Sequence, residues 1–172
     1  STTSVGSLLL VEINDLEELW VSYGDILYHA SSIGQIDNIK GSSTIAYDSD
    51  WLTRYLFRES GDIEKAEKLV CSDSTVIGLG SKINTELATG EFVGLVRIRG
   101  EELKLLKKLK TESPELLSRM GFSDLLEYMR LLGAKFNAFD LQGQWAELNE
   151  SKDIAHFVLG TKAETLFRLR DM

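Results

Sequence analysis

Near the start of the chain lies the segment Trp20-Val21-Ser22-Tyr23-Gly24-Asp25-Ile26-Leu27. It predicts a buried strand that ends at a lone carboxylate, Asp25, because an apolar run leads to a glycine at which the backbone can turn tightly. Ligands of open α/β sheets bind outside the carboxyl ends of the strands, so Asp25 is a candidate metal ligand. Capping of a following helix is the more common role of an aspartate at such a junction.

A second acidic segment, Trp145-Ala146-Glu147-Leu148-Asn149-Glu150, lies near the other end of the chain. In a strand, Glu147 and Asn149 point to the same side because they are two residues apart. Strand ends that bring hard oxygen ligands together can hold Mg²⁺ against a substrate phosphate. The alternative is a polar strand edge beside a turn.

The composition is that of a globular protein with one domain, residues 1–172. A net charge of −8 argues against a partner that is duplex nucleic acid, which normally meets a basic face. The single cysteine, Cys71, excludes an internal disulfide and fits a reducing compartment. No apolar run approaches the roughly 20 residues of a membrane-spanning helix, so a cytoplasmic protein without a membrane partner is expected.

The hydrophobic pattern predicts an α/β fold with a mixed sheet flanked by helices. The strand that ends at Asp25 is expected to be central. The expected strands span residues 19–23, 43–47, 68–71, 75–79, 92–98, 135–139 and 144–148. The expected helices span residues 7–13, 26–39, 101–110, 113–121 and 124–132, with two more after residue 151.

Other charged residues are weaker candidates. Asp48 follows a predicted strand, where an acid in a loop is usually just solvated. Arg54 and Arg58 are four apart, on one helical face, and could meet a phosphate or pair with surface acids. Lys82 follows a Gly-Leu-Gly-Ser segment that lacks the spacing of a P-loop but could still donate to a phosphoryl oxygen.

Taken in order, several segments resemble the later two-thirds of a nucleotidyltransferase domain. The likeness is to the cytidylyltransferase-like domains found alone or attached to phosphoenolpyruvate mutase in phosphonate and phosphocholine metabolism. The segments that carry it are Ser22-Tyr23-Gly24-Asp25-Ile26, Tyr47-Asp48-Ser49-Asp50-Trp51, Ala66-Glu67-Lys68-Leu69, Ile77-Gly78-Leu79-Gly80-Ser81-Lys82-Ile83, Gly90-Glu91-Phe92-Val93-Gly94-Leu95, Trp145-Ala146-Glu147-Leu148-Asn149-Glu150 and Phe157-Val158-Leu159-Gly160-Thr161-Lys162-Ala163-Glu164-Thr165-Leu166.

The resemblance implies a Rossmann-like fold that transfers a nucleoside monophosphate, CMP from CTP above all, to a phosphorylated or phosphono acceptor. It implies that Asp25 and Asn149 hold Mg²⁺. It places the substrate-side lysine on Lys82 and makes Glu91 and Gly94 part of the acceptor pocket.

This sequence departs from the family pattern in two ways. Asn149 replaces the usual aspartate, which shifts weight onto Glu147 as a metal ligand. The family's opening strand and glycine-rich loop has no counterpart, so the chain is expected to be the C-terminal portion of a longer enzyme and inactive alone. A non-catalytic interaction or regulatory module is the alternative, and the strand edge left open would favour a homo-oligomer.

Overall fold

The computed structural model describes residues 3–55 and 60–148. Arg58, Asn149 and the helices expected after residue 151 lie outside the described residues. Within this part of the chain, no helix is long and apolar enough to cross a membrane.

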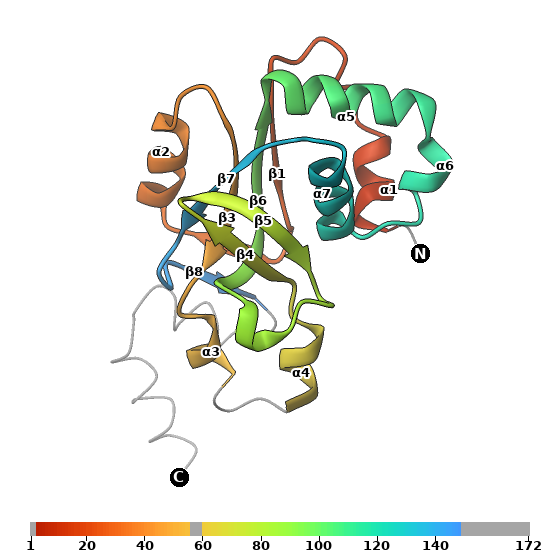
Figure 1. Ribbon diagram of the computed structural model, residues 1–172. Coiled ribbons are helices and arrows are strands. Elements are labelled where there is room, and N and C mark those ends of the chain that lie inside the picture. The colour runs from red at the N-terminus through yellow and green to blue at the C-terminus, as the bar shows by residue number, and fades with distance from the viewer. Residues whose placement is uncertain (1–2, 56–59, 149–172) are drawn as a thin grey trace.

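A six-stranded mixed sheet forms the middle of the molecule, as the sequence predicts (Figure 1). Strands β3 and β7 are parallel, and the other neighbouring strands of this sheet are antiparallel. In spatial order the strands are β1 (Glu18–Ser22), β6 (Gly90–Arg99), β3 (Ser43–Asp48), β7 (Phe136–Asp140), β5 (Thr75–Gly80) and β4 (Lys68–Ser72). A separate two-stranded sheet joins β2 (Ile26–Tyr28) to β8 (Trp145–Glu147).

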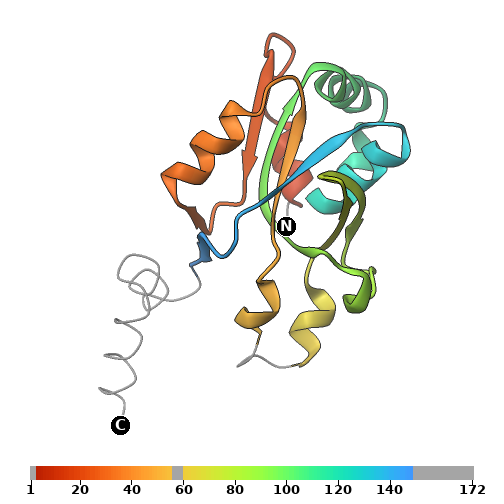
Figure 2. The ribbon, with the colours of Figure 1, turned by 60° about the vertical axis from the view of Figure 1, so that its left-hand side comes forward.

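Helices cover both faces of the sheet (Figures 1 and 2). Helix α2 (Ala30–Asn38) packs through Ile36 on one face, against a cluster that includes Ala46 and Leu95. The other face is covered by α1 (Ser4–Leu9), α5 (Gly100–Glu112), α6 (Pro114–Leu117) and α7 (Phe122–Leu131). Three short helices lie beyond the sheet: α3 (Trp51–Arg54), α4 (Ser60–Lys65) and η1 (Thr85–Leu87).

Strand β6 is buried on both faces, which explains why it reads as a nearly continuous apolar run. Arg97 interrupts the run, and its side chain is fully buried. Its guanidinium donates to the carbonyl oxygen of Asp37 at 2.9 Å and to that of Ile39, and lies 5.6 Å from the ring centre of Trp20. A buried charge is tolerated there because the end of α2 supplies carbonyl acceptors.

Strand β1 is not central within the described residues, contrary to the expectation. Among the strands that the structure describes, it pairs with β6 alone and forms one edge of the sheet. Residues 26–28 are also not helical, because they pair with residues 145–147 as β2. The helix expected over residues 124–132 begins two residues earlier, at Phe122, with Gly121 as its N-cap.

The directions of the strands place three acidic residues at one edge of the sheet. Because β6 runs antiparallel to both β1 and β3, and β7 is parallel to β3, the carboxyl ends of β1, β3 and β7 meet at the same edge. Asp25 follows β1, Asp48 ends β3 and Asp140 ends β7. This is the edge at which α/β sheets bind ligands.

Candidate functional site

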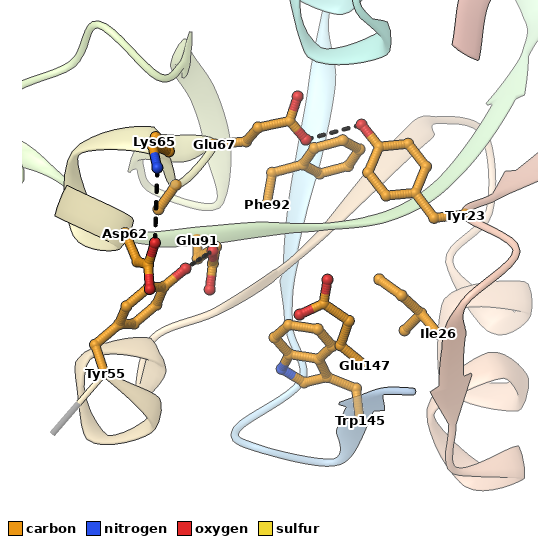
Figure 3. Close-up of a pocket in the computed structure, with 11 residues that line it drawn as sticks. Tyr23, Ile26, Tyr55, Asp62, Lys65, Glu67, Glu91, Phe92, Trp145 and Glu147 are labelled. Carbon is orange, nitrogen blue, oxygen red and sulfur yellow. Dashed lines mark hydrogen bonds and ion pairs between the residues drawn. The ribbon is translucent and has the colours of Figure 1, made fainter. Parts of the chain in front are cut away.

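A cleft of about 330 Å³ opens beside the carboxyl end of β1 (Figure 3). Its described lining includes four carboxylates and the ammonium group of Lys65. The lining residues are Tyr23, Ile26, Tyr55, Asp62, Lys65, Ala66, Glu67, Glu91, Phe92, Trp145 and Glu147. They come from five segments of the chain, residues 23–26, 55, 62–67, 91–92 and 145–147, which only the folded sheet brings together.

Glu91 is held in one wall of the cleft by a tyrosine. The Tyr55 hydroxyl donates to Oε1 of Glu91 at 2.5 Å, and Glu91 is 9% exposed. Lys68 lies opposite Glu91 in the β4–β6 register, and its Nζ donates to the carbonyl oxygens of Glu64, Ala66 and Ser81. Burial lowers the pKa of Lys68, and the charge of Glu91 partly offsets this. Lys68 thus ties α4 and the turn after β5 to strand β4.

Glu147 enters the cleft from β8, and its carboxylate points into it in Figure 3. In the β2–β8 register Glu147 lies opposite Ile26. One residue further, the amide of Leu148 donates to the carbonyl oxygen of Asp25 at 2.7 Å. Asp25 and Glu147 therefore lie on paired backbone segments, although they are far apart in sequence.

Asp48 holds β8 near the end of β3. It is buried, whereas the sequence suggested a solvated side chain. Its Oδ2 accepts from Nε1 of Trp145 at 2.7 Å, and its Oδ1 accepts from the amides of Asp50 and Gly143, each at 3.0 Å. Asp140 supports the same turn by accepting from the Ser49 hydroxyl at 2.6 Å. The error arose because burial of a carboxylate depends on donors that are remote in sequence.

The donor chemistry at this edge fits Mg²⁺. Mg²⁺ is usually bound by one or two carboxylates together with substrate phosphates and water, not by a protein cage. Glu147 lines the cleft, whereas Asp25 is exposed and does not line it, so the structure brings the backbones of these two candidate ligands together but shows no contact between their carboxylates. Residues 3–55 and 60–148 contain no group of three or more metal-ligating side chains, a result that leaves Asn149 untested.

The other predicted site residues fall in different places. Lys82 is exposed in the turn after β5 and does not line the cleft. Gly94 does not line it either; it packs against Tyr23, where an added Cβ would lie 2.4 Å from a ring carbon. Arg54 is the last residue of α3.

Sequence reasoning gave no site role to Tyr55, Glu67 or Trp145. Glu67 accepts from the Tyr23 hydroxyl at 2.8 Å across 44 residues of sequence. No local pattern marks such a pair, because the sheet register alone brings the two side chains together. The only signal was that Glu67 and Trp145 lie in segments that carry the family resemblance.

No family model matches this chain. In sequence it is similar to a Campylobacter jejuni protein named CTP:phosphoglutamine cytidylyltransferase, with 24% identity over 152 residues. The match covers 83% of this chain and 59% of that protein. The chain therefore spans about three-fifths of the length of the curated relative it matches.

Solved nucleotidyltransferase structures share its fold. The inositol-1-phosphate CTP transferase from T. maritima superposes with a TM-score of 0.60 at 17% identity, over 93% of this chain and 60% of that one. A UDP-glucose pyrophosphorylase bound to UDP-glucose gives 0.60 at 12% identity, over 97% and 62%. The fold of this chain is therefore the mixed α/β fold of nucleotidyltransferases.

Proposed function

We propose that this chain is part of a Mg²⁺-dependent nucleotidyltransferase that transfers CMP from CTP to a small acceptor carrying a phosphate or phosphonate. The observation that carries the proposal is the cleft at the carboxyl end of β1, where Glu91 and Glu147 converge beside the backbone of Asp25. The sequence similarity to a cytidylyltransferase supports the choice of CTP.

In the proposed reaction, a phosphoryl or phosphonyl oxygen of the acceptor attacks the α-phosphorus of CTP. The bond from that phosphorus to the bridging oxygen breaks, and pyrophosphate leaves with the electron pair. Mg²⁺, when bound, neutralises charge on the phosphate oxygens. Asp25 and Glu147 would hold it, with Asn149 as a third ligand. Transfer of this kind depends on positioning and charge neutralisation more than on covalent chemistry by the protein.

We assign the acceptor to the cleft itself. Glu91, with its carboxylate fixed by Tyr55, would accept hydrogen bonds from the acceptor's polar groups. Lys65 lines the cleft and is the better-placed ammonium for the acceptor phosphate, although its Nζ lies 3.8 Å from Asp62. Lys82, Gly94, Arg54 and Arg58 stay as sequence-based candidates for substrate contacts.

The test is pyrophosphate release from CTP, with aminoethylphosphonate and phosphocholine as acceptors. We expect no turnover by residues 1–172 alone and turnover by the same chain extended upstream with a glycine-rich loop. In the active protein, Asp25→Asn should lower kcat about 100-fold or more, since loss of such electrostatic stabilisation typically costs this much. Full activity of the Asp25→Asn variant would overturn the metal assignment.

The two lysines form a matched pair for the acceptor site. Lys65→Met should raise the acceptor KM about tenfold, as loss of a charge-assisted hydrogen bond of roughly 1.5 kcal/mol predicts. Lys82→Met should leave the acceptor KM unchanged if the cleft is the acceptor site. The reverse result would move the acceptor to the turn after β5.

The alternative is a non-catalytic module, which Asn149 in place of aspartate favours. The same assay separates the two, because a module would show no turnover even when extended upstream and supplied with Mg²⁺.

A further inference from the structure

Glu67 is held at the meeting point of three elements. Its carbonyl oxygen accepts from the amide of Phe92 at 2.7 Å, which fixes the backbone before β4 to the start of β6. Its Oε2 accepts from the Tyr23 hydroxyl at 2.8 Å, and its Oε1 accepts from the Ser123 hydroxyl of α7. Ser123 is 4% exposed, so this side of Glu67 faces the protein interior.

Packing against other aromatic rings also fixes the ring of Tyr23. Its ring lies edge-on to Phe92, with ring centres 5.9 Å apart, and to Phe122, at 6.3 Å. Its amide donates to the carbonyl oxygen of Gly94 at 3.0 Å. An alanine Cβ at Gly94 would approach Cδ2 of Tyr23 to 2.4 Å, so this ring position exists only because residue 94 has no side chain.

The segment after Tyr23 has little support of its own. Gly24 and Asp25 are exposed, and a Cβ added at Gly24 would meet nothing within 4 Å. The Leu148 amide donates to the carbonyl oxygen of Asp25 at 2.7 Å. The backbone at Asp25 is therefore held from two sides, by β8 and by the anchored Tyr23.

We infer that Glu67 is a positioning residue that holds the backbone of the Gly24-Asp25 segment, acting through the Tyr23 hydroxyl. This rests on the proposed function, in which Asp25 is a metal ligand. The Glu67 carboxylate accepts from the hydroxyls of Tyr23 and of the buried Ser123, so it ties the end of β1 to α7, and its carbonyl oxygen adds the link to β6. Partners that orient a metal ligand typically change metal affinity by about 10- to 100-fold when removed.

A direct role in contacting the acceptor is the competing explanation, because Glu67 also lines the cleft. The two differ in what they change. A positioning residue alters the affinity for the metal, and Tyr23→Phe reproduces the effect. A contact residue alters the acceptor KM and is insensitive to Tyr23→Phe.

The experiment compares Tyr23→Phe, Glu67→Gln and the double variant, using Mn²⁺ as the probe of the Mg²⁺ site. Mn²⁺ affinity is measured by electron paramagnetic resonance on residues 1–172. Each single variant should weaken Mn²⁺ binding about tenfold. The double variant should be no weaker than the worse single, because both remove the same interaction. The matched control is Tyr128→Phe, which alters another half-buried tyrosine of the core. This variant should bind Mn²⁺ as tightly as the unmodified protein does.

A second measurement keeps the two proposals apart. Hydrogen exchange at residues 24–26 should speed up about tenfold in Tyr23→Phe and in Ser123→Ala, since a hydrogen bond to a charged group is worth roughly 1.5 kcal/mol. If the parent binds no Mn²⁺, the metal assignment fails, and exchange alone decides the positioning role. Unchanged exchange in both variants, or additive losses of Mn²⁺ affinity, would overturn the inference.

Discussion

At the scale of single residues, the structure depends on two kinds of position: glycines that make room and buried tyrosines that must stay neutral. Gly94 has φ +72 and faces Tyr23. Burial, and next the charge of Glu67, raise the pKa of Tyr23 above its ordinary value. Both effects act on Tyr23, which lies two residues before the candidate metal ligand Asp25.

Gly94→Ala should destabilise the fold by at least about 2 kcal/mol, because it combines a left-handed backbone with a clash against Tyr23. Gly24→Ala is the matched control. Its added Cβ meets nothing within 4 Å, so the change should stay within about 0.5 kcal/mol. Urea midpoints of the two variants give the comparison, and equal midpoints would contradict the tight packing at residue 94.

Stability should fall at alkaline pH. Tyr23 and Tyr28 have raised pKa values in the folded state; that of Tyr28 is about 12, mainly because of burial. The folded state thus favours the neutral phenol, and this stabilisation is complete below the ordinary value of 10.0 and is lost as pH rises above it. Each tyrosine contributes a slope of at most about 1.4 kcal/mol per pH unit.

Urea unfolding between pH 8 and pH 12 measures this slope. Tyr23→Phe should be less sensitive to pH than the parent above pH 10, because phenylalanine has no proton to lose. A parallel pH dependence in the parent and in this variant would show that Tyr23 does not titrate differently in the folded state.

At the scale of elements, the small β2–β8 sheet carries the site, and it depends on Asp48. This carboxylate accepts three hydrogen bonds, and it holds Trp145 and the preceding turn at the end of β3. Strand β8 has only three residues, so it is too short to hold its register alone. The location of Glu147 is thus decided by a side chain on another strand.

Asp48→Asn should destabilise the protein by about 2 kcal/mol and speed hydrogen exchange in residues 145–148, because its amide cannot accept at both positions. Asp73→Asn is the control. Asp73 is exposed in the β4–β5 turn with φ 47, a backbone region that asparagine also adopts readily. Exchange in β8 that is equal in both variants would exclude Asp48 as its anchor.

At the scale of the whole molecule, the main feature is the edge of β1 that has no partner strand among residues 3–55 and 60–148. The amide of Arg99 faces β3. Because the hydrogen-bonding direction of the backbone alternates along β6, the amides of Val96 and Ile98 face β1. In the same register, the amides of Trp20 and Ser22 on β1 point away from β6. An apolar groove of about 430 Å³ runs between α1 and β1 beside this edge. Such an edge readily pairs with another strand.

We expect residues 1–172, studied alone, to dimerise by pairing β1 with β1 of a second copy. Light scattering at micromolar concentration tests this. Ser22→Pro removes an outward amide without breaking a β1–β6 bond, so it should return the protein to a monomer. A parent that is monomeric, with fast exchange at Trp20 and Ser22, would show that the edge stays unpaired.

The sequence by itself determined the elements whose signal is local. The strands near residues 43–47 and 92–98 and the helix over 101–110 follow from apolar runs and helical periodicity. The hairpin of β4 and β5 follows from a polar turn between two apolar runs, and Asp73 and Ser74 adopt positive φ there. These elements suffice for an α/β fold with a mixed sheet.

Only the tertiary structure decided how the site is assembled. Tyr23 meets Glu67 across 44 residues and Asp48 meets Trp145 across 97, and neither pair has a local signature. Residues 26–28 read as helix from their own sequence and became a strand because β8 offered a partner. Burial of a polar side chain depends on where its remote donors lie, and register between distant strands sets those positions.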